Sequence, residues 1–89
     1  MSDSRVKVKV EVTGDAFWEI FLPNPNKLFQ KPQTETETEL ETGNYNLAYK
    51  IRGEPGTTYK VYFCERVVAD GTLDSENMAT DSVIVTVPC

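Results

Sequence analysis

Two segments of this sequence are rich in acidic residues, and their residue types and spacing could support chemistry. The first segment, QTETETELETG over residues 33–43, has a glutamate at every second position. Its carboxylates are those of Glu35, Glu37, Glu39 and Glu41. The second segment covers residues 70–81 and includes Asp70, Asp74, Glu76 and Asp81. Carboxylate oxygens are the ligands that calcium prefers, and they also attract basic partners.

The spacing of these carboxylates argues against a tight metal site. Side chains two positions apart on one strand face lie about 6.5–7 Å apart, so the glutamates of a ladder cannot all share one ion. We interpret the ladder as the solvated, salt-paired face of a strand, with recognition of a basic partner as the alternative. Residues 70–81 lack EF-hand spacing, so we expect a solvated loop there. A carbohydrate or calcium site that uses this loop is the alternative.

Several other kinds of chemistry lack the residues they need. The sequence contains no histidine, which is the usual general base and the commonest zinc ligand. It contains neither a P-loop nor a GxGxxG motif. Two cysteines alone cannot close a zinc site. We therefore expect no enzymatic activity, no metal and no cofactor, with calcium as the alternative.

The cysteines and the N-terminus bear on the compartment. Cys64 and Cys89 do not form a CxxC motif, and we expect two free thiols. The alternative is a single bridge between them, which would require an oxidising compartment. The N-terminal sequence MSDSRVKVKV has no feature of a signal peptide, which favours the cytoplasm. A domain excised from a longer protein would look the same, so the compartment stays open.

Length and charge set further bounds. With 89 residues the chain has room for one core, so we expect a single domain over residues 1–89, with residues 1–4 disordered. The net charge of −5 argues against a nucleic acid or an anionic membrane as partner, because both bind surfaces rich in lysine and arginine. No segment approaches the roughly 20 apolar residues that a membrane-spanning helix needs.

The elements that must position these residues are strands. Alternation of apolar and polar residues recurs along the chain, and no long segment has helical spacing. The strands expected from this pattern cover residues 5–12, 16–22, 34–42, 45–52, 58–68 and 82–87. Loops are expected over 24–33 and 69–81. The pattern predicts an all-β, single-domain antiparallel β-sandwich of six to seven strands.

Two turns suggest how the strands pair. Gly43-Asn44 fits a type II′ hairpin turn, which would place Glu37 opposite Lys50 and Glu35 opposite Arg52. Residues 54–57, Glu-Pro-Gly-Thr, fit a type II turn. For this second connection we favour a hairpin of odd length over a bulge or a crossing to the other sheet. The segment LETGNYNLAYKIRGEPGTTYKVYF, residues 40–63, resembles immunoglobulin-like and prealbumin-like sandwiches in style. That resemblance implies a fold and no function.

One strand is apolar on both faces, and it provides the candidate contact surface. In residues 16–22 the aromatic rings of Phe17 and Phe21 alternate with apolar residues of the opposite face, and Glu19 lies between them. Tyr62 has the same outward parity in its own strand. We predict that Phe17, Glu19, Phe21 and Tyr62 bind a partner, because exposed apolar patches usually mark interfaces. The alternative is that the loop over residues 24–33 covers the rings.

These observations predict a non-enzymatic binding or assembly module. It would recognise a protein partner or self-associate through an apolar sheet face. The alternative is a carbohydrate- or calcium-binding β-sandwich module that uses the acidic segment 70–81. A structural subunit that pairs an exposed edge strand with a neighbouring chain is a further alternative.

Overall fold

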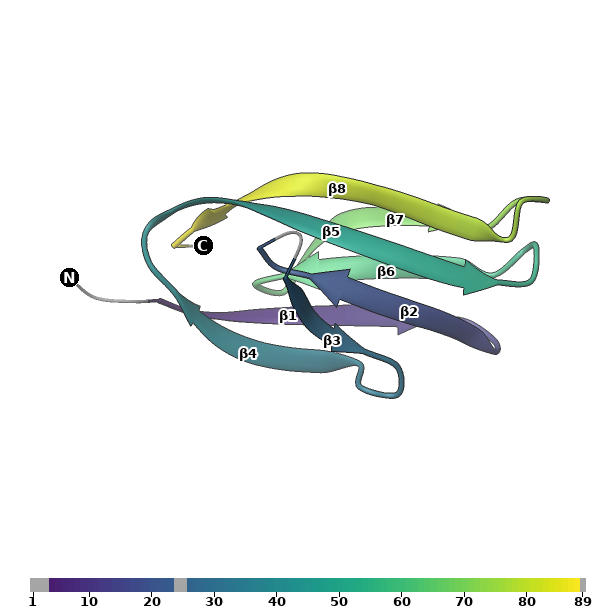
Figure 1. Cartoon of the computed structure of the whole chain (residues 1–89), viewed down its shortest axis with the longest axis horizontal. Helices are drawn as coiled ribbons and strands as arrows, with labels where there is room; N and C mark the ends of the chain where they lie inside the picture. The colour runs from purple at the N-terminus through teal and green to yellow at the C-terminus, as the bar shows by residue number, and fades with distance from the viewer. Residues whose placement is uncertain (1–3, 24–25, 89) are drawn as a thin grey trace.

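The protein is a sandwich of two antiparallel β-sheets. The computed structural model describes residues 4–23 and 26–88. These residues form β1 (Ser4–Val12), β2 (Ala16–Phe21), β3 (Lys27–Gln30), β4 (Glu35–Leu40), β5 (Gly43–Gly53), β6 (Thr58–Phe63), β7 (Arg66–Thr72) and β8 (Met78–Val87). Sheet A has the order β4-β1-β6-β7 and sheet B the order β3-β2-β5-β8 (Figure 1). The predicted antiparallel β-sandwich is confirmed, with eight strands in the described residues instead of six to seven.

The core lies between the sheets and follows from the alternation in the sequence. Successive side chains of a strand point to opposite faces, so one apolar residue in two can be buried. The largest fully buried side chains come from both sheets: Ile20, Leu47, Ile51, Val6, Val8, Val10, Val61 and Val87. The rings of Tyr49 and Tyr59 also meet across the sheets, with their centroids 5.7 Å apart. No helix long and apolar enough to cross a membrane occurs in residues 4–23 and 26–88.

The expected hairpin at Gly43-Asn44 is wrong. Strand β4 lies in sheet A and pairs with β1, from Ser4 opposite Leu40 to Lys9 opposite Glu35. The chain then passes into sheet B, where β5 pairs with β2 and β8. Strand β5 pairs with β2 on one side and β8 on the other, so it has no free edge for β4. The charges are compatible with either pairing, because β1 and β5 both carry cations at alternate positions and exposed ion pairs contribute little each.

The second connection is a crossing between the sheets and not the hairpin of odd length. Strand β5 belongs to sheet B and β6 to sheet A. The predicted turn itself is present, because the Thr57 N–H donates to the Glu54 carbonyl at 3.1 Å. Gly56 has a φ of 94°, as the third position of a type II turn requires.

Four expected boundaries are corrected. The run over residues 58–68 is two strands joined at Cys64-Glu65, whose φ values of 54° and 67° match a type I′ hairpin turn. The expected loop over 69–81 is mostly strand, because β7 extends to Thr72 and β8 begins at Met78. The expected loop over 24–33 contains β3. Ser4 is not disordered, since it begins β1, and residues 1–3 lie outside the described residues.

The expectation of free thiols is also wrong. Cys64 is disulfide-bonded, and Cys89 lies outside the described residues. Cys64 lies at the tip of the β6–β7 hairpin and lines the same surface hollow as Val85 and Pro88 at the end of β8. The fold therefore brings this hairpin to the C-terminal end of the chain, which spacing in the sequence alone does not show.

Candidate functional site

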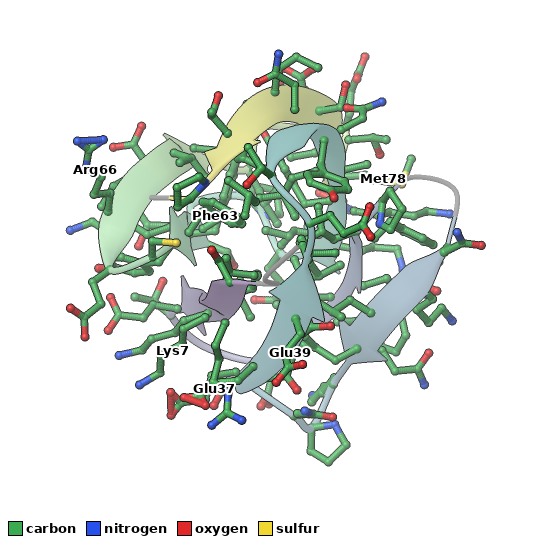
Figure 2. The ribbon with its side chains drawn as sticks, turned by 90° about the vertical axis from the view of Figure 1, so that its left-hand side faces the viewer. Lys7, Glu37, Glu39, Phe63, Arg66 and Met78 are labelled. Carbon is green, nitrogen blue, oxygen red and sulfur yellow. The ribbon has the colours of Figure 1, made fainter. Side chains whose placement is uncertain are left out.

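The outer face of sheet A carries a network of ion pairs. Lys7 Nζ lies 3.1 Å from Glu35 Oε2, and Lys9 Nζ lies 3.4 Å from Glu11 Oε2. Arg5 contacts two carboxylates of β4, those of Glu37 at 3.8 Å and Glu39 at 3.5 Å. Lys7, Glu37 and Glu39 lie at the outside of the molecule in Figure 2. The interpretation of the ladder as a solvated, salt-paired face is confirmed for Glu35, Glu37 and Glu39, whose partners lie on β1 and not on β5 as expected. Glu41 lies beyond the end of β4.

Tyr62 is part of this network. Its hydroxyl donates to Glu11 Oε1 at 2.7 Å, and Lys9 Nζ lies 5.6 Å from the centre of its ring. The hydrogen bond from Tyr62, helped by Lys9, lowers the pKa of Glu11, and the same bond raises the pKa of Tyr62. Because β6 is in sheet A and β2 in sheet B, the structure does not bring Tyr62 together with Phe17, Glu19 and Phe21.

The outer face of sheet B has a different composition. Its register forms rows across the three longest strands: Phe17, Arg52 and Met78; Glu19, Lys50 and Thr80; Phe21, Ala48 and Ser82. We call this surface, together with Asn44, Asn46, Ile84 and Thr86 in the next rows, the β2–β5–β8 face. Met78 and Ile84 are large apolar residues exposed by 45% and 68%. Arg52 lies over the Phe17 ring, with 5.6 Å between the guanidinium carbon and the ring centre.

Phe17 and Phe21 are half-buried among their neighbours and are not core residues. The alternative in which residues 24–33 cover these rings is not what the described residues show. Strand β3 pairs with the edge of β2, and Phe29 of β3 is buried in the core at 4% exposure. Both rings therefore remain accessible on the outer face of sheet B.

Glu19, at the centre of the predicted contact surface, is neutralised by Lys27. Lys27 Nζ lies 2.8 Å from Glu19 Oε2 and also donates to Gln30 Oε1 at 2.7 Å. The hydrogen bond from Lys27 lowers the pKa of Glu19, and the attraction of Lys27, Lys50 and Arg52 adds to that effect. The carboxylate is thus held ionised, but it is occupied by a neighbour in the same sheet.

The acidic residues that the calcium alternative would use do not cluster around one point. Asp70 lies on β7 opposite Lys60, and Asp81 Oδ1 accepts a bond from the Ser82 N–H at 2.8 Å. Asp74 Oδ1 accepts a bond from the Glu76 N–H at 2.9 Å and so closes a local turn. In the part of the chain that the structure describes, no three or more metal-binding side chains lie close enough to hold an ion.

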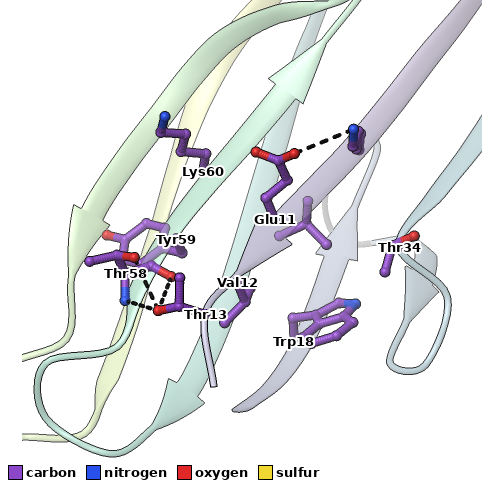
Figure 3. A pocket seen from close by; sticks show the side chains of 10 residues that line it. Glu11, Val12, Thr13, Trp18, Thr34, Thr58, Tyr59 and Lys60 are labelled. Atoms are coloured by element: carbon purple, nitrogen blue, oxygen red, sulfur yellow. Dashed lines mark hydrogen bonds and ion pairs between the residues drawn. The ribbon is translucent and has the colours of Figure 1, made fainter. Parts of the chain in front are cut away.

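A cavity of about 540 Å³ opens between the sheets, and sequence reasoning missed it. The β1–β4 ladder ends at Lys9 and Glu35, so the last residues of β1 extend beyond the start of β4. Trp18 lies at this opening (Figure 3), and its indole N–H donates to the Gln33 carbonyl at 2.7 Å. The cavity is lined by Lys9, Val10, Glu11, Val12, Thr13, Trp18, Thr34, Thr58, Tyr59 and Lys60. These residues come from distant segments, so no motif marks the site.

Comparison of the chain with protein families, with characterised proteins and with solved structures gives no match. Function must therefore be inferred from the two outer faces and the cavity. Of the predicted contact residues, Phe17, Glu19 and Phe21 share one surface with Arg52 and Met78, which the parity of β2 alone could not reveal.

Proposed function

We propose that the protein is a non-enzymatic binding or assembly module that contacts a protein partner through the β2–β5–β8 face. The observation that carries this proposal is the contrast between the two outer faces. On sheet A the cations of β1 are paired with carboxylates of β1 and β4. Sheet B has the half-buried Phe17 and Phe21 and the exposed Met78 and Ile84 on its outer face, with one ion pair, Lys27 with Glu19, among the described residues. Aromatic residues, methionine and arginine are enriched in protein interfaces, and an apolar cluster on a small domain usually marks one.

The proposal is tested with a double variant, Phe17→Ser with Phe21→Ser. Both rings point away from the core, so the variant should keep its circular dichroism spectrum and lose association. Val67→Ser is the matched control, because Val67 is an apolar residue of sheet A that is exposed by 48%. Cross-linking in an extract, with quantitative mass spectrometry, should show partners that the wild type and the control retain and the double variant loses.

Self-association needs its own measurement. Sedimentation velocity at increasing concentration separates a monomer from a self-associating chain. If the chain associates, the double variant should sediment as a monomer and Val67→Ser should not. The proposal is wrong if the double variant unfolds, which would show that the rings are core residues. It is also wrong if the double variant and the control behave alike in both assays.

A second candidate function is carbohydrate binding, and the cavity at Trp18 favours it. An indole, the Tyr59 ring and threonine hydroxyls line this cavity, and such a combination can stack on and hydrogen-bond to a sugar. Trp18 is the only tryptophan of the sequence, so its fluorescence reports directly on the site. Titration with neutral oligosaccharides should shift its emission in a saturable way. An unchanged spectrum would end this candidate.

We infer an oxidising compartment from the disulfide bond of Cys64, because such bonds persist outside the reducing cytosol. This inference replaces the cytoplasmic location that the N-terminal sequence favoured. The finer assignment of the sandwich as immunoglobulin-like or prealbumin-like stays a prediction.

A further inference from the structure

The β2–β5–β8 face, together with the adjoining side chains of β3, is positively charged although the chain is acidic. Its charged side chains are those of Lys27, Lys50, Arg52 and Glu19. Three cations therefore stand against one carboxylate, while the whole chain has a net charge of −5. Asp81 of β8 lines the same hollow as Phe21 and Lys50 at the edge of this face, and with it the cations still outnumber the carboxylates by three to two among the described residues. A local field opposite in sign to the net charge steers and orients a partner of complementary charge.

Two of these cations, Lys50 and Arg52, are not compensated by a direct ion pair within the described part of the chain, although both also attract the Glu19 carboxylate. Lys27 holds Glu19 at 2.8 Å, which removes the one carboxylate of the face from further pairing. Among the described residues, neither Lys50 nor Arg52 lies within ion-pair distance of a carboxylate. Both lie on β5, which is flanked by β2 and β8 and so occupies the middle of the face. Arg52 is exposed and is oriented by the Phe17 ring beneath it.

We propose that the partner of the β2–β5–β8 face is an acidic protein surface that presents carboxylates to Lys50 and Arg52 around an apolar centre. This inference rests on the proposed function and names the chemistry of its partner. A guanidinium presents paired N–H donors that match a carboxylate, and a rigid sheet holds them in place before binding. Phe17, Phe21 and Met78 would supply the apolar contact around these bonds.

A second copy of the same face does not fit. Docking two such faces would bring the Lys50 and Arg52 side chains of both copies together, and like charges at an interface are strongly unfavourable. The glutamates of sheet A do not fit as the partner either, because Arg5 and Lys7 already hold three of them. We therefore assign the acidic surface to a different protein, and docking of the other acidic segments of a second copy is an outcome that the test distinguishes.

The test uses ¹⁵N-labelled protein and three synthetic peptides in which leucine and phenylalanine alternate with glutamate, glutamine or lysine. A single-stranded DNA oligonucleotide is the fourth probe. The glutamate peptide should shift the amide signals of Phe17, Lys50, Arg52 and Met78. Its affinity should fall by about tenfold or more between low salt and 0.5 M salt, because exposed charges are screened over about 10 Å at roughly 0.1 M ionic strength. The lysine peptide should leave these signals unchanged.

Charge reversal gives the matched comparison. Lys50→Glu with Arg52→Glu should abolish binding of the glutamate peptide and create binding of the lysine peptide. Lys60→Glu with Arg66→Glu changes the same two residue types on sheet A, where both side chains are exposed, and should leave glutamate-peptide binding as in the wild type.

The remaining outcomes separate the two proposals. Equal binding of the glutamine and glutamate peptides at this face would overturn the acidic partner and leave the protein-binding function standing. If none of the peptides binds, both proposals fail. Binding of the oligonucleotide at Lys50 and Arg52 in preference to the glutamate peptide would show that the face recognises phosphate. A dimer that Lys50→Glu with Arg52→Glu dissociates would show that the occupant is a second copy.

Discussion

The two sheets have matching interiors and different exteriors. Each contributes four strands and buries alternate apolar residues against the other. On the outside, sheet A pairs Arg5, Lys7 and Lys9 with carboxylates of β1 and β4. On sheet B, Lys50 and Arg52 lie beside aromatic rings and form no ion pair with another described residue. Burial constrains the inner faces alike, so the difference must come from what each outer face meets: water on sheet A, and on sheet B, by our proposal, another protein.

The edge strands β4 and β8 differ in charge as the two outer faces do. Strand β4, an edge of sheet A, alternates glutamate and threonine, and its charges oppose pairing with another chain. Strand β8, an edge of sheet B, has Asp81 as its one charged side chain and exposes Ile84. The charges of β4 therefore disfavour pairing with another chain at that edge of sheet A, whereas the edge of sheet B at β8 has few charges to oppose it. Both differences support the proposal that the contact surface lies on sheet B.

The largest expected change in stability is a difference between an inward-facing and an outward-facing residue of β2. Ile20 is fully buried and Phe21 is half-buried on the outer face. Ile20→Ala should lower the free energy of unfolding by about 2–5 kcal/mol, because a buried isoleucine loses its contacts and leaves a cavity. Phe21→Ser should lower it by less than half as much. Urea unfolding followed by circular dichroism measures both. Equal losses would show that the outer face of sheet B is covered, and the contrast between the exteriors would fail.

The sequence predicts the interior because alternation encodes it locally. Val6, Val8 and Val10 recur at every second position of β1, and all three are buried. The same alternation places the glutamates of β4 on a solvated face. Parity also puts Phe17 and Phe21 on an outer face. Each of these predictions needs only the residues of one strand.

The pairing of strands could not be predicted in the same way. The glutamates of β4 find cations on either β1 or β5, so charge in the sequence left the choice open until strand positions were known. Parity places Tyr62 outside but does not say outside which sheet. Strand β3 has four residues, too few to show a period. The hairpin at Cys64-Glu65 uses positive φ values without the glycine or asparagine that normally signals them.

A smaller loss of stability is expected when one arginine on each outer face is replaced. Arg5 contacts two glutamates of β4, whereas Arg52 stacks on Phe17 without an ion pair among the described residues. Arg5→Glu should lower the free energy of unfolding by about 0.5–1 kcal/mol at low salt, since each exposed pair contributes little and the new charge repels its neighbours. Arg52→Glu should have a smaller effect on unfolding. Urea unfolding at low salt and at 1 M salt should show the difference shrink. A larger loss from Arg52→Glu would mean that this arginine serves the fold.

The smallest expected effect concerns the one carboxylate on each face whose pKa is lowered. Glu11 of sheet A owes its lowered pKa first to Tyr62, and Glu19 of sheet B owes its own first to Lys27. Both pKa values lie below the ordinary 4.5 in the folded chain, so each group adds stability above pH 4.5. That stability is lost as the pH falls through the lowered value. NMR titration of the side-chain carboxyl carbons measures both pKa values directly.

Removing each donor sharpens the contrast between the faces. Tyr62→Phe should raise the pKa of Glu11 and leave that of Glu19 unchanged, because the two groups lie on opposite faces of the sandwich. Lys27→Gln should raise the pKa of Glu19, since its main hydrogen bond is lost. If the pKa of Glu19 stayed low without Lys27, then Lys50 and Arg52 would be holding the carboxylate themselves. They would not then be uncompensated cations, and the charge that we assign to the partner would already be present within sheet B.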